Sequence, residues 1–292
     1  MITYYINQTV MGILMKKINY DDSTLKHLQK LELMILKDFI KICEYNNIEY
    51  FMCGGSLLGT IRHEGFIPWD DDIDIIMFRS EYEKFVEIYE KNPLDKYELL
   101  TPENTPDYFL LFSKLVLKST KFEEWWDSQV SFDLGIFLDI FILNDAPNNK
   151  IMKKIHVFRT RLLSRMISIS TLKFVNYPTI TQIVVNSLHY IFKSLRITPT
   201  YLKKKTIRLL KKYSQKDTKY VFDVAATAYP PLFLKEDYSP AKKAKFEDIM
   251  VNIPNNYDKI LTTTYGDYMK LPPKEERYNH VTYNLDFGIY KD

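Results

Sequence analysis

The chain has 292 residues, of which 46% are apolar and 26% are charged. That apolar content suffices for one large or two modest cores and excludes intrinsic disorder as a class. Two cysteines cannot form a disulfide framework or a four-cysteine zinc site, which favours a reducing compartment. The N-terminal sequence MITYYINQTVMGILMKK places its lysines after its short apolar stretch, the reverse of a secretory signal. We therefore expect a cytosolic protein without a cleaved leader.

Charge is distributed unevenly along the chain. Residues 1–149 carry 14 Lys and Arg against 25 Asp and Glu, residues 150–216 carry 16 against none, and residues 217–292 carry 10 against 12. A stretch of 67 residues without a carboxylate is not ordinary surface composition for this chain. The middle segment is therefore predicted to face an anionic partner, which is anionic lipid, a phosphate-bearing polymer or nucleic acid.

The first half of the chain alternates predicted helices and strands. Residues 22–46 repeat apolar side chains at spacings of 3 and 4, which predicts an amphipathic helix with Asp22 or Ser23 as its N-cap. The elements expected after it are, in order, a strand at Ile48–Cys53, a turn at Gly54-Gly55, a helix at Ser56–Arg62, a loop at Phe66–Trp69, a strand at Asp72–Phe78, a helix from Ser80 as cap to about Glu90, and strands at Tyr97–Leu100, Leu110–Leu117 and Gly135–Leu143. This order predicts an α+β fold, a mixed sheet flanked by helices.

Residues 150–216 are predicted to be mostly helical, with breaks at Pro178 and Pro199. The stretch from Phe174 to Phe192 has no charged residue but contains several Asn, Gln, Ser and Thr residues. It is too polar to cross a membrane, so we expect an interfacial or buried helix.

The acidic sequence DDDID at residues 70–74 indicates a metal site. If these residues lead into a strand, Asp70, Asp72 and Asp74 share one face and Asp71 points away. Carboxylates on that face would lie roughly 6–7 Å apart and repel by roughly 2–2.5 kcal/mol per pair, which a divalent cation would relieve. Hard oxygen ligands suit Mg²⁺ or Mn²⁺. The alternative is an acidic loop in which Asp70 and Asp71 are solvated and Asp72 caps a turn.

Upstream of this cluster, Gly54-Gly55-Ser56 follows a predicted strand and opens a predicted helix. A glycine turn at this place presents backbone N–H groups where a phosphate can bind. A phosphate-binding turn together with metal-binding carboxylates is typical of a phosphoryl-transfer site.

The run from Gly54 to Ile75 closely resembles the signature of the LicD family, a branch of the nucleotidyltransferase fold related to the fukutin-type transferases. Its Gly-Ser and Asp-x-Asp pattern corresponds here to Gly55-Ser56 and Asp72-Ile73-Asp74. Further matches are Lys114, the sequence GIFLDIF that contains Asp139, and the tail from Tyr265 to His280. The resemblance covers about residues 22–145 and 245–285, and the basic segment lies outside it.

The resemblance implies roles for these residues. Asp72 and Asp74 would be the principal metal ligands, with Asp70 as a further one. Asp139 lies on an apolar strand, where an unpaired carboxylate is costly, so it would complete the metal site or accept a proton; metal ligation is the preferred interpretation. The alternative is a structural Asp at a strand end whose hydrogen bonds are satisfied. Ser56 and the Gly55 amide would hold the donor phosphate.

Three cations are candidates to neutralise the departing nucleotide phosphate, although each is equally well explained as a structural or surface residue: Arg62, Lys114 and Arg277. His63 and His280 could serve as acid or base, or be structural. Trp69 could form an aromatic wall for a quaternary ammonium group or pack the loop. Trp125 and Trp126, among acidic neighbours, allow the same two interpretations.

The resemblance implies metal-dependent transfer of phosphocholine, or a related phospho-alcohol, from a CDP-activated donor to a glycan or teichoic-acid-type precursor. Residues 1–149 and 217–292 would build the catalytic domain, and residues 150–216 would bind an anionic membrane surface or the acceptor. The expected location is cytoplasmic, at the inner face of the membrane. The alternatives are a nucleotidyltransferase acting on a small molecule, sugar or RNA, and an inactive binding protein. No RNA-binding motif is present, so a nucleic-acid partner is not expected.

Overall fold

A mixed β-sheet occupies the centre of the protein in the computed structural model, which describes residues 21–124, 126, 129–172, 179–225, 231–277, 279 and 282–291. The leader prediction for the N-terminal residues, the predicted site residue His280 and the prediction for Trp125 lie outside the described residues. Five strands follow one another in the sheet: β1 (Phe51–Met52), β2 (Asp74–Phe78), β6 (Phe137–Ala146), β4 (Ser113–Leu117) and β3 (Tyr97–Leu100). The C-terminal part of the chain adds β7 (Tyr220–Asp223) and β8 (Phe233–Leu234) to this sheet, through the pairing of β7 with β6.

Strand β6 is the central element because it pairs with three neighbours. It runs parallel to β2 and antiparallel to β4 and β7. Its sequence FLDIFILNDA is almost continuously apolar, and nine of its ten residues are buried. A strand that is covered on both faces has this composition, whereas a strand with one solvated face alternates.

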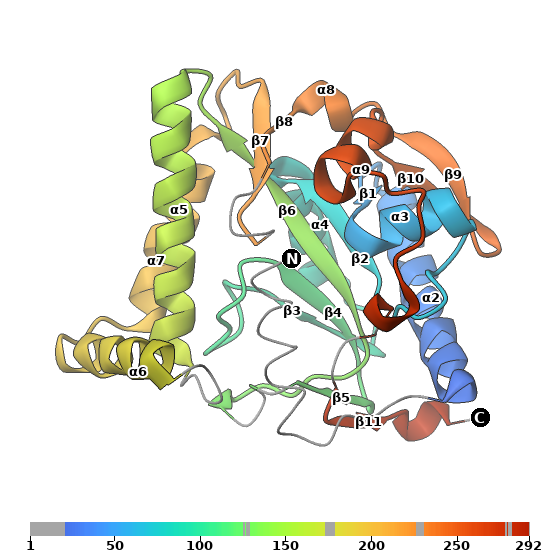
Figure 1. Ribbon diagram of the computed structural model, residues 1–292, viewed down its shortest axis with the longest axis horizontal. Coiled ribbons are helices and arrows are strands. Elements are labelled where there is room, and N and C mark those ends of the chain that lie inside the picture. Colours follow the sequence, from blue (N-terminus) through green and yellow to red (C-terminus); the bar gives the residue numbers. More distant parts are fainter. Residues whose placement is uncertain are drawn as a thin grey trace.

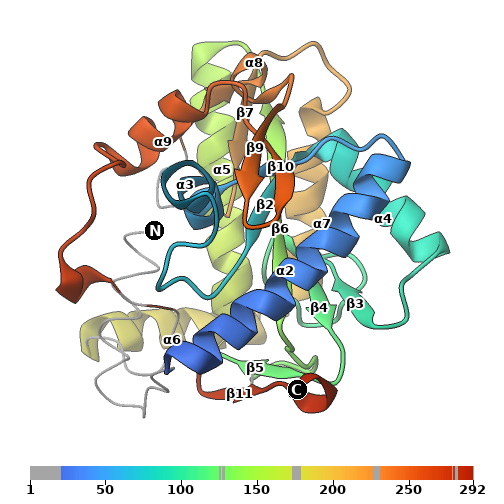
Figure 2. The ribbon, with the colours of Figure 1, turned by 90° about the vertical axis from the view of Figure 1, so that its right-hand side faces the viewer.

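Helices cover the sheet. Helices α2 (Asp22–Tyr45) and α4 (Arg79–Lys91) pack against β6, and α4 also contacts β2 (Figure 2). The buried residues of α2 recur at the predicted spacing, with Leu28, Leu31, Ile35 and Phe39 in the core. Helix α3 (Gly54–His63) connects β1 to the acidic loop that precedes β2.

The basic segment forms three helices, α5 (Lys150–Thr171), α6 (Thr179–Ser194) and α7 (Pro199–Leu210). They lie together at one edge of the molecule, on the left in Figure 1, and α3 and α9 lie at the opposite edge. Helix α5 packs against α7 and α6. Within the described ranges, none of the helices combines the length and apolar content that crossing a bilayer requires.

The remaining chain folds around the α3 edge and the lower end of the sheet. Its elements are the pairs β9 (Lys242–Phe246) with β10 (Ile249–Ile253) and β5 (Lys121–Glu123) with β11 (Asn284–Asp286), the helices α8 (Lys235–Tyr238) and α9 (Tyr257–Tyr265), and short 3-10 turns at Lys274–Glu276 and Gly288–Tyr290. A further 3-10 turn, Lys211–Tyr213, follows α7 directly. The predicted α+β class, a mixed sheet flanked by helices with a basic helical insertion, is confirmed.

Several predicted element ends are wrong. The N-cap of α2 is Asp21, not Asp22 or Ser23, because the Asp21 carboxylate accepts the Thr24 N–H at 2.6 Å. Ser80 does not cap α4, which already begins at Arg79. The strands begin later than predicted because apolar residues before them pack in loops, and pairing starts only at Asp74, Ser113 and Phe137.

Candidate functional site

The first turn of α3 lies beside the acidic loop. The helix begins at Gly54, and its N-cap residue Cys53 makes no side-chain hydrogen bond to it. Gly54 has a φ of +56°, a left-handed conformation that favours glycine. The first N–H groups of a helix point outward along its axis, and the helix dipole favours negative charge there. This turn has the backbone geometry of an anion-binding site.

Two carboxylates lie directly against the turn. A Cβ atom on Gly55 would stand 2.7 Å from Asp70 Oδ2, and a Cβ atom on Gly54 would stand 2.7 Å from Asp74 Oδ2. The Ser56 hydroxyl oxygen accepts a hydrogen bond of 2.8 Å from the Asp74 backbone N–H, which ties α3 to the start of β2. The sequence Gly54-Gly55-Ser56 therefore makes room for both carboxylates and fixes the position of one of them.

The acidic loop alternates in burial as predicted. Asp71 is fully buried, whereas Asp70, Asp72 and Asp74 are partly exposed. The alternation arises in an extended loop, since β2 begins at Asp74 and not at Asp72. The alternative interpretation, in which Asp71 is solvated, is wrong.

Asp74, Asp139 and Lys114 occupy neighbouring positions on three adjacent strands. Asp139 on β6 is in register with Asp74 on β2 and with Lys114 on β4. Residues in register on adjacent strands project from the same face of a sheet. The row places a carboxylate, a second carboxylate and an ammonium group side by side.

The carboxylate of Asp139 is paired. Lys114 Nζ lies 2.7 Å from Asp139 Oδ1, and both side chains are buried. The same Nζ lies 3.3 Å from the centroid of the Phe137 ring, so the ammonium group sits between a carboxylate and an aromatic face. Lys114 therefore avoids the cost of an unpaired carboxylate on this apolar strand.

Burial raises the pKa of Asp139 to about 7, Lys114 acts against this rise, and the nearby Asp72 carboxylate adds to it. A group with a pKa close to neutrality is suited to accept and release a proton. The influence of Asp72 also shows that the acidic loop and the start of β6 share one electrostatic environment.

A second group of predicted residues gathers at the other end of α3. Arg62 donates from Nη1 to the Tyr268 carbonyl oxygen at 2.9 Å and from Nε to His63 Nε2 at 2.9 Å. The guanidinium carbon of Arg277 lies 5.0 Å from the centroid of the Trp69 ring. Burial lowers the pKa of Arg62, and the charge of Arg277 lowers it further, so the two cations are neighbours.

The predicted site residues thus form two groups separated along α3. Gly55 and Ser56 lie in its first turn and Arg62 in its last, about 10 Å apart along the helix axis at 1.5 Å per residue. The loop from Glu64 to Asp72 runs back along the helix, because Asp70 lies against Gly55 in the first turn, and Trp69 directly precedes Asp70. Lys114 belongs to the first group, where it pairs with Asp139, and Arg277 belongs to the second.

The carboxylates of the acidic loop and the strands fit one kind of metal site. Among the residues that the structure describes, no three or more His, Cys, Asp or Glu side chains are arranged to hold a metal. Mg²⁺ is commonly held by only one or two carboxylates, with substrate phosphates and water as the other ligands. Asp72 and Asp74 are partly exposed hard oxygen donors close to the first turn of α3, and they fit a site with two carboxylate ligands.

Two residues of the site were missed by the sequence analysis. Phe137 lies two positions before Asp139 on β6, and strand alternation would have placed it on the same face. Glu247, in the turn between β9 and β10, accepts the Phe66 N–H at 3.0 Å and so anchors the loop that leads to Asp70. This contact joins residues far apart in the chain, and no local sequence pattern signals it.

Comparison with known proteins adds an independent finding. The family model described as LicD/FKTN/FKRP, nucleotidyltransferase domain, matches residues 47–163, which include α3, the acidic loop, β2, β4 and β6. The chain is 31% identical over 266 residues to the lipopolysaccharide cholinephosphotransferase LicD of Haemophilus influenzae, and the match covers 88% of this chain and 96% of that protein. Two uncharacterized proteins, from Rickettsia prowazekii and Rickettsia typhi, are each 48% identical over 48 residues, which is 16% of this chain. Those matches cover 18% and 16% of the two proteins.

The predicted resemblance is confirmed by these matches, and the predicted enzyme class agrees with a relative that is named as a cholinephosphotransferase. The similarity extends over nearly the full length of that relative, and so also over the segments outside the family model. The chain belongs to the LicD family.

Proposed function

We propose that this protein transfers phosphocholine, or a related phospho-alcohol, from a CDP-activated donor to a hydroxyl group of a cell-surface glycan precursor. The LicD relative, named for lipopolysaccharide, supports a lipopolysaccharide-type acceptor, and a teichoic-acid-type precursor is the other acceptor we consider. Because such precursors can be lipid-linked, we place the enzyme at the inner face of the cytoplasmic membrane, as a peripheral protein.

One observation carries the proposal. Asp74 lies at once against the anion-binding turn of α3 and in register with Asp139 on β6. A donor phosphate bound at the turn would therefore lie beside Asp74, on the sheet face that also carries the Asp139–Lys114 pair. Phosphoryl transfer needs this juxtaposition, because its catalysis consists mostly of positioning and charge stabilisation.

The proposed phosphate contacts come from α3. The backbone N–H of Gly55 and the Ser56 hydroxyl donate to phosphate oxygens; the Ser56 oxygen already accepts from the Asp74 N–H, so its proton stays a donor. Mg²⁺ or Mn²⁺, held by Asp72 and Asp74 with Asp70 beside them, would neutralise charge on the donor phosphates.

Asp139 is assigned to the acceptor proton. As the acceptor oxygen forms its bond to phosphorus, the bond from phosphorus to CMP breaks, and the hydroxyl proton passes to the Asp139 carboxylate. We prefer this role to metal ligation because Lys114 already occupies Oδ1 and orients the group. The carboxylate would accept the proton through its other oxygen.

The second group of residues would hold the remainder of the donor. Arg62 and Arg277 supply positive charge for the departing nucleotide phosphate. The Trp69 ring already accepts a guanidinium on its face, which is the recognition that a quaternary ammonium group requires. A donor lying along α3 would reach from the first group to the second.

A donor screen tests this proposal. The full chain is incubated with Mg²⁺ and a lipopolysaccharide acceptor together with CDP-choline, CDP-ethanolamine, CDP-ribitol or CDP-glycerol, and released CMP is measured. We expect CMP from at least one donor with the wild type, and none with Asp74→Asn. The domain name of the family model favours nucleotidyl transfer as the second candidate. Release of pyrophosphate from a nucleoside triphosphate, without CMP release from any donor, would replace the first proposal by the second.

A further inference from the structure

Helix α5 has a buried face and an exposed apolar face on opposite sides. One face is buried in the protein and contains His156, Val157, Thr160 and Ile167. The other is an exposed stripe at spacings of four, three and four, in which Ile151 is 70%, Ile155 51%, Phe158 64% and Leu162 48% exposed. At 100° per residue, the four stripe residues lie within about 60° of one another around the helix. We call this set the α5 stripe.

Helix α6 adds a second exposed apolar surface. None of its described side chains is buried, and Ile180 is 78%, Ile183 60%, Val184 53% and Ile191 47% exposed. The helix is held against α5, and His189 Nδ1 lies 2.8 Å from the Ile169 carbonyl oxygen. In both views α6 runs across one end of α5, at the edge of the molecule (Figure 1, Figure 2). Contiguous exposed apolar side chains on this scale mark an interaction surface.

Cations border the α5 stripe. Lys154 and Arg165 lie on one side of it around the helix and Arg159 on the other, and all of residues 150–216 lack a carboxylate. Next to the stripe, a groove of about 430 Å³ between α5 and α7 is lined by the cations Arg159, Lys205, Arg208 and Lys212.

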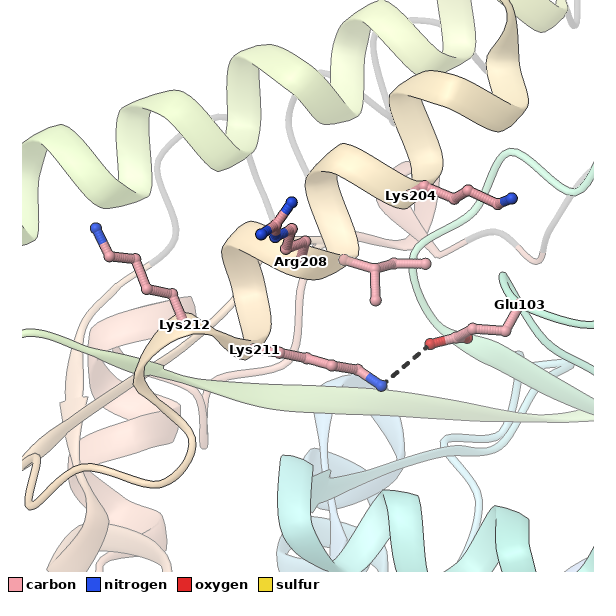
Figure 3. A pocket seen from close by; sticks show the side chains of 6 residues that line it. Glu103, Lys204, Arg208, Lys211 and Lys212 are labelled. Atoms are coloured by element: carbon pink, nitrogen blue, oxygen red, sulfur yellow. Dashed lines mark ion pairs between the residues drawn. The ribbon is translucent and has the colours of Figure 1, made fainter.

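A second hollow beside α7 is also lined mostly by cations. Figure 3 shows Lys204, Arg208, Lys211 and Lys212 projecting from α7 and the turn after it, with Lys211 Nζ 3.8 Å from Glu103 Oε1. Of the six residues that line this hollow, Glu103 alone is acidic.

We infer that the outer faces of α5 and α6 dock on an anionic lipid surface, with the α5 stripe among the lipid headgroups and the bordering cations against lipid phosphates. Apolar residues bordered by basic ones are the signature of helices that lie in a membrane interface. A second copy of this chain fits the surface poorly, because docking two copies would bring their cationic borders together. The inference makes the proposed peripheral location specific, and it involves no residue of the candidate active site.

Vesicle co-sedimentation tests the inference with the full chain, in the absence of donor and divalent metal. The wild type is expected to bind vesicles of equal parts phosphatidylglycerol and phosphatidylcholine at least about tenfold more tightly than pure phosphatidylcholine, and to lose most of this binding at 1 M salt, where the Debye length is about 3 Å. Because the readout is lipid binding alone, failure of the transfer reaction would leave this test unaffected.

Matched variants separate insertion from charge. Ile155→Ser/Phe158→Ser should weaken binding to anionic vesicles about tenfold, since two exposed side chains lose their apolar burial in the interface. The control Met250→Ser/Ile289→Ser removes apolar residues of similar exposure elsewhere, at 53% and 78%, and should bind like the wild type. Circular dichroism checks that each variant is folded.

A depth measurement supplies a second readout. With Phe158→Trp, vesicles that contain brominated lipid should quench the added fluorescence, whereas Met250→Trp should show no added quenching. Equal binding to neutral and anionic vesicles, or unchanged binding of Ile155→Ser/Phe158→Ser, would overturn the inference. So would a wild-type dimer in light scattering that this double variant converts to a monomer, because the occupant would then be a second copy.

Discussion

Lys114 and Asp139 form a buried ion pair across β4 and β6, with 2.7 Å between Nζ and Oδ1. The pair lies next to Asp74 in the register of the sheet, so it belongs at once to the core and to the candidate active site. An ammonium group at this position both compensates a buried carboxylate and fixes its orientation. The two functions can be separated by experiment.

Lys114→Met should lower the free energy of unfolding by about 1–3 kcal/mol, because the buried Asp139 carboxyl loses its countercharge and its hydrogen-bond donor. The double variant Lys114→Met/Asp139→Leu should recover much of that loss, since neither charge is then left alone. Urea denaturation measures both. Lys91→Met, which breaks the exposed pair of Lys91 with Glu87, serves as the control and should unfold like the wild type. A double variant less stable than Lys114→Met would contradict this account.

Asp72→Asn and Asp74→Asn should each abolish CMP release while the fold is retained. The reason is that each substitution removes a ligand charge from the proposed metal site and also relieves repulsion between carboxylates, so the unfolding free energy should hold or rise slightly. Asp95→Asn removes a negative charge in an exposed loop and should keep full activity. Near-normal turnover of both Asp72→Asn and Asp74→Asn at saturating Mg²⁺ would refute the assignment of the ligands.

Asp139→Asn distinguishes a proton acceptor from a metal ligand. If the carboxylate accepts the hydroxyl proton, the variant should bind Mn²⁺ like the wild type and transfer about 10²–10⁴-fold more slowly. Isothermal titration with Mn²⁺ and single-turnover rates measure the two properties separately. Weakened Mn²⁺ binding, with part of the rate restored at high Mn²⁺, would assign Asp139 to the metal instead.

Gly54→Ala should impair the active site more than it impairs stability. The added Cβ would stand 2.7 Å from Asp74 Oδ2, and a carboxylate can rotate away from such a contact at little cost to the fold. Gly266→Ala is the control for backbone strain: its φ of +70° with ψ of −123° is a conformation that L residues rarely adopt, and no atom among the described residues lies within 4 Å of the added Cβ. Both variants should lose stability, and CMP release should fall more with Gly54→Ala. Equal loss of activity in the two would show that backbone strain is responsible.

His156 should make stability depend on pH between about 6.5 and 4. Burial lowers its pKa to about 4, and the charges of Lys212 and Arg159 lower it further. Because the folded state binds the proton less well than the unfolded state, the stability contributed by neutral His156 is complete above pH 6.5 and is lost as the pH falls towards 4. In His156→Phe, the decrease in urea midpoint from pH 7 to pH 5 should be smaller than in the wild type. An equal decrease would assign the effect to other groups.

The sequence by itself determined those features that depend on neighbours along the chain. Apolar spacing of three and four residues predicts α2 because an isolated helical turn already shows which side chains share a face. The alternation of Asp70 to Asp74 likewise follows from an extended backbone, whether or not a strand forms there. The glycines and the serine in the first turn of α3 predicted an anion-binding geometry through conformational rules that apply to a few residues at a time.

The partners of these features were decided by the tertiary structure. Lys114 meets Asp139 because β4 and β6 pair in one register, and a shift of a single residue would send Lys114 to the opposite face of the sheet. Register is set by the whole sheet, so it cannot be derived from either strand alone. The proximity of Arg277 to Arg62 and Trp69 was also decided by the fold, because Arg277 is far from both residues in the chain.

The basic segment shows the same division. Its composition alone predicts an anionic partner, since charge is a property of the residues and not of their arrangement. The packing of α5 against the sheet and α7 decides which face of the helix enters the core and which remains exposed. These contacts involve distant parts of the chain. Amphipathic periodicity identifies faces, whereas burial of a face is a property of the folded molecule.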